Sequence, residues 1–390
     1  MRTYFKLKET PQQIALIQAI GSKNLQVSME AQMALAAFLG PVFGKVLTTK
    51  GTVSAIYEDA PYDENGDASY PLDLYYGETD NHVAVWSQQT NGGLPSSQIT
   101  GNKEMKFMTY TLDSAVSFNK KYARQSRLEI VSRAIARMLN EVLIKQELNG
   151  WQVVLKALAE ASTTPKGGTA LDHVIRANTA GSFLLNDLND LLTRHVRLNE
   201  SYSGNTPDDV YSNGPTDLYV SPEIKGQVRA FAYNPMNTKA GVTGTTGTPA
   251  GSTVGIALPE EMRMDIYRNA GMQSIFGANL VQLNEFGVGK KYNLLFDNYG
   301  AGVSALFAKL DGTTGNAAFN QASEEILVGV DNSRGAFVRP VARDSERNST
   351  FTVLPDDQWN LARLDKAGFF GNMEEGRVCL DARAVSGIIV

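Results

Sequence analysis

The sequence predicts a mixed α+β protein, and three features of the chain indicate this class. Residues 119–148 have the periodicity of one long helix, and residues 52–112 before them are aromatic and strand-like. After residue 180, helical and strand-like segments alternate, and the end of the chain returns to strands. Such an arrangement is typical of α+β folds. Because a single core rarely grows beyond about 250 residues, we expect the 390 residues to form more than one subdomain.

Composition and charge place the chain among ordinary globular proteins and exclude several classes. It is 43% hydrophobic and 20% charged, and its net charge of −5 argues against nucleic-acid binding through overall positive charge. Cys379 is the single cysteine, which excludes an internal disulfide, and we predict that it is a buried small residue. His82, His173 and His195 have no acidic or cysteine neighbour at ligand spacing and are predicted to be structural.

Membrane-spanning and secretory segments are not indicated by the sequence. No segment has the roughly 18 uninterrupted apolar residues that a bilayer requires, and the strongest candidate, Met33–Phe43, is interrupted by Pro41. The N-terminus has no small-residue cleavage site of a secretory signal. We therefore expect no membrane partner.

Residues 1–51 are predicted to form an N-terminal arm with two short helices. Thr10 provides a capping hydroxyl for the first helix, and Gly21 ends its apolar pattern. The second helix, Met29–Leu39, is expected to stop at the Gly40-Pro41 pair. It is apolar on too many sides to stand free in water, so the arm must pack against its own chain or another subunit.

Residues 52–112 are predicted to form an extended β loop. Asn65-Gly66 is a two-residue hairpin signal, and His82–Trp86 and Met105–Leu112 suit strands. A two-stranded hairpin is marginal in water by itself, and its exposed aromatic side chains would be tolerated if a neighbouring molecule covered them. Three residues of this loop are predicted to lie in a subunit interface: Tyr62, Asp63 and Trp86.

The long helix, Asn119–Leu148, is predicted from apolar residues that recur every three or four positions. Five of them share one face: Leu128, Val131, Ile135, Met138 and Val142. The helix would be about 45 Å long. Gly150 lies near its predicted end, and a continuation of the same helix through Trp151 to Ala161 stays open.

The basic residues of this helix admit two interpretations. As a solvated face, they would form pairs such as Glu129–Arg133 and Arg137–Glu141, each contributing about 0.2–0.5 kcal/mol. As a contact surface, they would meet acidic loops of neighbouring subunits or packaged nucleic acid. Four have no acidic residue four positions further on, and we predict that they lie in a subunit interface: Lys120, Lys121, Arg124 and Arg127.

The rest of the chain is predicted to be a mixed α/β unit followed by strands. A helix with a leucine face covers 184–192, and a second helix begins at Ser221-Pro222 and runs to residue 232. The predicted strands are Asp217–Val220, Gly277–Phe286, Tyr292–Phe296, Ala336–Val341, Ser349–Leu354 and 376–390.

Motifs for catalysis or cofactor binding are not matched. Gly287–Lys290 lacks the spacing of a phosphate-binding loop, and Ser117–Lys120 lacks the companion motifs of a nucleophilic serine. The side chains of Asp59, Asp63, Asn65 and Asp67 could collect Ca²⁺, but the ligand pattern is incomplete and a solvated acidic turn is favoured. We therefore predict no enzyme activity, no cofactor and no metal site.

The order of elements resembles that of major capsid proteins of tailed bacteriophages over almost the whole chain. An arm, an extended loop, a long spine helix, a central α/β domain and a final return of strands follow one another. The segments that carry the resemblance are TYTLDSAVSFNKKYARQSRLEIVSRAIARMLNEVL, DLYVSPEIKGQVRAF, ILVGVDNSRGAFVRPVARD and EEGRVCLDARAVSGIIV.

This resemblance implies a domain organisation. The arm would cover 1–51 and the extended loop 52–112, lying over an adjacent subunit. A peripheral domain with the spine helix would comprise 105–180 and 325–365, and an axial domain 181–324 and 366–390.

The resemblance also implies partners and a location. Copies of the chain would form hexamers and pentamers of an icosahedral shell in the virion, assembled in the host cytoplasm. The shell would enclose double-stranded DNA without sequence-specific binding. Since the arm is not strongly basic, the genome would be pumped into a preformed shell rather than gathered by the coat. A portal is expected. Because the sequence leaves no room for a scaffolding extension before the arm, either a separate scaffolding protein or an extension already removed is needed, and we favour the separate protein. Two alternatives remain: an encapsulin-like shell, and a soluble α/β enzyme or binding protein.

Overall fold

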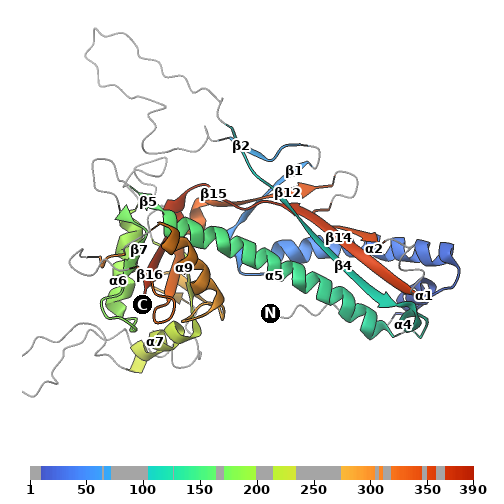
Figure 1. Ribbon diagram of the computed structural model, residues 1–390, viewed down its shortest axis with the longest axis horizontal. Helices are drawn as coiled ribbons and strands as arrows, with labels where there is room; N and C mark the ends of the chain where they lie inside the picture. The colour runs from blue at the N-terminus through green and yellow to red at the C-terminus, as the bar shows by residue number, and fades with distance from the viewer. Residues whose placement is uncertain are drawn as a thin grey trace, which may run out of the picture. The chain divides into compact units, whose positions relative to one another are not determined.

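A computed structural model describes residues 10–63, 66–71, 104–125, 127–163, 171–198, 214–233, 274–303, 307–310, 318–344, 349–356 and 365–390 (Figure 1). It is an α+β fold, as the sequence predicts. The chain forms two compact units. The first comprises Met1–Leu72, Lys103–Trp151 and Phe337–Val378, and the second Asp73–Asn102, Gln152–Ala336 and Cys379–Val390. These divisions differ from the four predicted domains, whose roles as arm, loop, peripheral and axial parts stay predictions.

The N-terminal helices belong to the first unit. Helix α1 (Pro11–Ile20) begins as predicted, because the Thr10 hydroxyl accepts a hydrogen bond from the Gln13 backbone N–H at 3.4 Å. The prediction that the second helix stops at Gly40-Pro41 is wrong: helix α2 (Leu25–Thr49) continues through both residues. Beyond the proline, Phe43 and Leu47 are buried in the core, so their packing compensates for the backbone hydrogen bond that a proline cannot make.

By length and hydropathy alone, α2 is apolar enough to cross a membrane. Half of the apolar stretch is buried inside the protein, and a core helix of a soluble protein meets the same criterion. Glycines let α2 approach strand β13 (Thr352–Pro355) and the residues before it closely. A Cβ atom on Gly44 would lie 3.2 Å from the Thr350 Oγ1 atom.

Strand β14 (Lys366–Glu375), which sequence reasoning missed, organises the sheet of the first unit. It pairs antiparallel with β4 (Tyr110–Asn119) along all ten residues and with β13 on its other side. Strand β12 (Phe337–Arg343) pairs with β14 and, in parallel, with β1 (Glu58–Asp63). Gly371 is required within β14, because a Cβ atom there would lie 2.4 Å from the Phe351 ring.

The predicted long helix is two helices. A short helix, α4 (Lys120–Arg124), is separate from α5 (Leu128–Glu160), whose 33 residues are about 50 Å long. The predicted apolar face is confirmed for Val131, Ile135, Met138 and Val142, which are buried; the Leu128 side chain lies outside the described residues.

Gly150 does not end α5. A Cβ atom on Gly150 would lie 2.3 Å from the Val53 Cγ1 atom, so this glycine allows the short helix α3 (Val53–Ile56) to contact α5. The glycine that suggested a helix end therefore marks a close contact within the unit.

The described strands on either side of Asn65-Gly66 do not form the predicted hairpin with each other. Strand β1 pairs with β12, while β2 (Ser69–Pro71) pairs antiparallel with β3 (Glu104–Lys106). The Gly66 N–H donates to the Asp63 carbonyl oxygen at 2.7 Å. The predicted strand at His82–Trp86 lies outside the described residues.

The second unit contains a mixed sheet whose strands have the order β7-β16-β11-β8-β10-β9. Their bounds are β7 (Val174–Arg176), β16 (Val385–Ile389), β11 (Ile326–Val330), β8 (Asp217–Val220), β10 (Ala278–Gln282) and β9 (Ser274–Ile275). Helices α6 (Leu185–Arg197) and α7 (Pro222–Tyr233) have buried leucine, isoleucine and valine side chains in the same core. Strands β5 (Ser162–Thr163) and β6 (Leu171–Asp172) pair with each other in a separate sheet, and β15 (Val378–Cys379) pairs with β12.

One predicted strand of the second unit is a helix. Residues 292–296 belong to α9 (Lys291–Val303). Tyr292 and Phe296, four positions apart, are buried, whereas Leu294 between them is 44% exposed. That spacing is helical, and the short apolar run YNLLF was ambiguous between the two structures. By contrast, β8 and the start of α7 are as predicted, with the Ser221 hydroxyl accepting from the Ile224 N–H at 3.0 Å.

Candidate functional site: a buried ionic joint at strand β14

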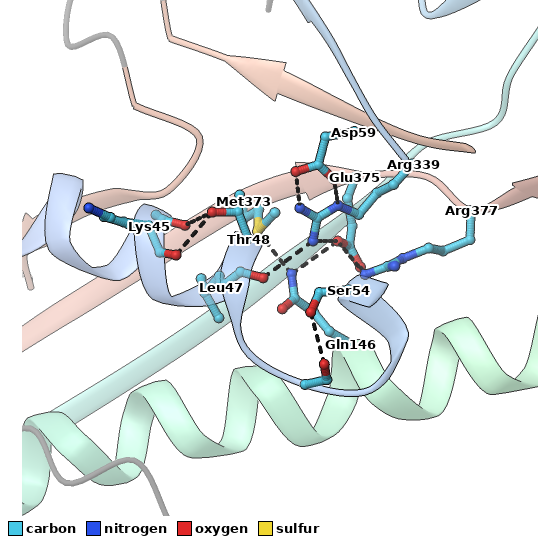
Figure 2. Close-up of polar contacts among 12 residues, drawn as sticks. Lys45, Leu47, Thr48, Ser54, Asp59, Gln146, Arg339, Met373, Glu375 and Arg377 are labelled. Atoms are coloured by element: carbon cyan, nitrogen blue, oxygen red, sulfur yellow. Dashed lines mark hydrogen bonds and ion pairs between the residues drawn. The ribbon is translucent and has the colours of Figure 1, made fainter. Parts of the chain in front are cut away.

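Four charged side chains from three strands and the turn after β14 meet inside the first unit (Figure 2). They are Asp59, Arg339, Glu375 and Arg377, and we call this cluster the ionic joint. The Arg339 side chain is 2% exposed, and its Nε and Nη2 atoms donate to the two Asp59 carboxylate oxygens at 2.5 and 2.6 Å. A bidentate pair of this kind holds β1 in register on β12.

Glu375 is fully buried and is the centre of the joint. One carboxylate oxygen accepts from the Tyr110 hydroxyl at 3.0 Å, and the other from Gln146 Nε2 at 3.0 Å and Arg377 Nη2 at 3.1 Å. Burial, and then the charge of Glu375, raise the pKa of Tyr110 to about 12, so its hydroxyl remains a donor. The carboxylate thus connects β14 to β4 and α5.

Arg377 completes the joint beside an aromatic ring. Its guanidinium lies 4.8 Å from the centre of the Tyr57 ring, a cation–π contact. The Tyr57 hydroxyl in turn donates to the Gly150 carbonyl oxygen at 3.0 Å. Removing Glu375 would leave the Arg377 charge buried without its carboxylate partner, and removing Arg377 would take away one of the two cations beside Glu375.

The neighbouring Glu374 connects the two sides of the region predicted as an extended loop. Its Oε1 atom accepts from the Tyr62 hydroxyl at 2.9 Å and from the Thr109 hydroxyl at 2.5 Å. Tyr62 lies at the end of β1, and Thr109 directly precedes β4. Residues on the two sides of this region, Tyr62 and Thr109, are therefore held by the same carboxylate.

Helix α5 fixes the start of the same region. Glu147 accepts from the Thr52 hydroxyl at 2.6 Å and from the Val53 backbone N–H at 3.2 Å, which caps α3 in place of a local side chain. Trp151 Nε1 donates to the Thr52 hydroxyl at 3.2 Å. Gly51, at φ +106°, leaves room for this carboxylate, because a Cβ atom would lie 2.0 Å from it.

The loop residues predicted to lie in an interface have different surroundings. Tyr62 is half-buried in the contact with Glu374, and Asp63 is exposed at the end of β1. Trp86 lies outside the described residues.

The basic residues predicted to lie in an interface also divide into two groups. Lys121 and Arg127 are exposed. Lys120 is buried, its ammonium donates to the Ser28 hydroxyl at 3.1 Å, and burial lowers its pKa. Arg124 donates to the Gly21 carbonyl oxygen and to Asp365, both at 2.6 Å. Lys120 and Arg124 thus connect α4 to other parts of the unit, and the interface role of these residues stays a prediction.

The solvated-face interpretation of the long helix is confirmed at one pair. Arg133 and Glu129 form an exposed ion pair at 2.5 Å. Two of the acidic residues considered for Ca²⁺ are engaged elsewhere: Asp59 in the joint, and Asp67 with Lys106 at 2.5 Å. Within the described ranges, no group of three metal-ligating side chains occurs.

Sequence reasoning did not find the ionic joint. One signal was available, because Arg339 lies between apolar residues in FVRPVAR and would be buried if that segment were a central strand. Its acidic partner at Asp59 lies 280 residues earlier, and no spacing rule connects the two.

Among known proteins, only solved structures are similar to this chain, and the similarity is one of fold. No protein-family model and no curated protein matches the chain. Among solved structures, the capsid of the cyanophage P-SCSP1u is 14% identical and has a TM-score of 0.43, with 85% of this chain and 86% of that chain covered. Microbacterium phage Oxtober96 is 11% identical at a TM-score of 0.47, covering 88% and 91%.

An encapsulin is also similar in fold. The SrpI encapsulin of Synechococcus elongatus is 10% identical at a TM-score of 0.40, covering 87% of this chain and 88% of that chain. These are the two classes, phage capsid and encapsulin, that the sequence resemblance named.

Proposed function

We propose that this chain is a major capsid protein, whose copies assemble into hexamers and pentamers of an icosahedral shell enclosing double-stranded DNA. It acts as a structural protein and not as an enzyme. In this proposal the region between Asp63 and Thr109 reaches a neighbouring copy, with Tyr62, Asp63, Trp86, Lys121 and Arg127 near the contacts.

The observation that carries the proposal is the two-stranded ribbon β2/β3. It forms a sheet of its own, and Met105 and Met108 are exposed at 36% and 92%. A two-stranded ribbon with exposed apolar side chains is marginal in water by itself. Glu374 of strand β14 nevertheless binds Tyr62 before the ribbon and Thr109 after it, so the ribbon has a fixed base.

An encapsulin-like shell would use the same surfaces and differ in its contents. Expression with the genomic neighbours, followed by negative-stain microscopy and analysis of the particle contents, separates the two. Nuclease-protected DNA supports the capsid, whereas a copurified cargo protein supports the encapsulin alternative.

A variant in which a short glycine-rich turn replaces residues 73–102 tests the role of the loop. The joint and β2/β3 remain, so we expect a folded subunit with the far-UV circular dichroism of the wild type and no particles. Met108→Asp should also lower particle yield, but less strongly. Leu294→Asp, at an exposed apolar position in the second unit, is its matched control. Unchanged particle yield in the loop replacement would refute the proposal.

A further inference from the structure

One side of helix α2 is an exposed apolar face. Met33, Ala34, Ala37, Phe38 and Pro41 are all exposed, with Met33 at 49% and Phe38 at 53%. Their spacings of three and four place them on one side of the helix. Contiguous apolar surface of this kind indicates a contact with another molecule.

Opposite charges border the face at equal distances from its centre. Glu30 lies seven residues before Ala37, and Lys45 lies seven residues after Phe38; both are exposed. Fifteen residues are close to four helical turns, so the two charges project from the same side as the apolar residues, about 22 Å apart along the axis.

This arrangement is complementary to itself in one orientation. If two copies of α2 lie antiparallel about a two-fold axis between Ala37 and Phe38, each Glu30 meets a Lys45 of the other copy. A parallel pair would instead place like charges together. Contacts in which the same patch is used on both subunits are the usual form of a two-fold interface.

The side chains near the axis suit close contact. Ala34 and Ala37 are small, so two helices can approach each other there. Beside them is an apolar hollow of about 170 Å³, lined by Gln13, Leu16, Ile17, Leu35 and Phe38. Phe38 belongs both to this hollow and to the exposed face, so the two are adjacent.

We propose that α2 forms an antiparallel two-fold contact with α2 of a second copy, closed at each end by a Glu30–Lys45 ion pair. The inference rests on the proposed assembly and names one of the surfaces that it uses. It assigns the partner, the orientation and the residues at the axis.

Charge reversal tests the orientation. Glu30→Lys and Lys45→Glu each place like charges at both ends of the contact, so each single variant should lower particle yield about tenfold, as the loss of two surface pairs and the gain of two repulsions imply. The double variant E30K/K45E restores opposite charges and has the net charge of the wild type. It should assemble at the wild-type level, and Phe38→Asp should assemble poorly.

Yield is measured by sedimentation and negative-stain microscopy, and thermal unfolding of the subunits verifies that all variants are folded. Normal assembly of both single variants overturns the α2 contact. Reduced assembly of the singles without rescue in the double variant overturns the antiparallel orientation. If the wild-type chain forms no particles under any condition, the proposed function fails together with the contact, whereas the first two outcomes leave that function intact.

Discussion

His195 should make the second unit sensitive to mild acid. Its side chain is fully buried in α6, and Nδ1 lies 2.8 Å from the Ser386 hydroxyl. Burial first, and then the charges of Arg334 and His173, lower the pKa of His195 from 6.5 to about 3. Well above pH 6.5 the imidazole is neutral whether the chain is folded or unfolded, so no stability depends on its titration there.

The sign follows from which state binds the proton. As the pH falls below 6.5 the unfolded chain takes up a proton at this residue and the folded chain does not, so the folded state loses stability down to pH 3. Between pH 7 and pH 5 the loss is about 2 kcal/mol from His195 alone. Burial also lowers the pKa of His173, which acts in the same direction. The raised pKa values of Asp187 and Glu325 act oppositely, because those carboxyl groups bind protons more tightly when folded.

The variant His195→Gln isolates the effect, because an amide can contact Ser386 but does not titrate. We expect urea denaturation, followed by circular dichroism, to show that the wild type loses about 2 kcal/mol more than H195Q between pH 7 and pH 5. Ser386→Ala retains the imidazole and should retain the steep pH dependence. Equal losses in wild type and H195Q would refute the reasoning.

The other predictions concern the first unit. Urea denaturation measures the change in stability for each variant. Gly150→Ala should destabilise the fold, because overpacking against Val53 costs about 1–3 kcal/mol while the helix propensity of alanine recovers about 1 kcal/mol. Adding Val53→Ala to this variant should relieve the clash. Additive losses of stability from the two substitutions would argue against a direct contact. Arg339→Met should cost about 3–5 kcal/mol by leaving Glu375 without one of its cations, and Lys121→Met, at an exposed site, should change little. Tyr62→Phe should lower subunit stability by only about 1 kcal/mol and should also reduce particle yield. A particle yield equal to that of the wild type would assign Tyr62 to the fold alone.

Local chemistry determined several elements from the sequence by itself. The Thr10 cap, the strand Asp217–Val220 followed by the Ser221 cap, and the apolar face of α5 were all predicted, because each depends on neighbours within one or two helical turns. The α+β class followed from the same periodicities.

Tertiary contacts decided what local rules could not. Gly40-Pro41 and Gly150 read as helix ends, yet α2 and α5 continue because buried partners far along the chain stabilise them. The apolar run in 292–296 became helix by burying positions four apart. The ionic joint joins Asp59 to Arg339 and Glu375 across some three hundred residues. Long-range pairing of this kind depends on which strands become neighbours, and that is a property of the packed fold rather than of any segment.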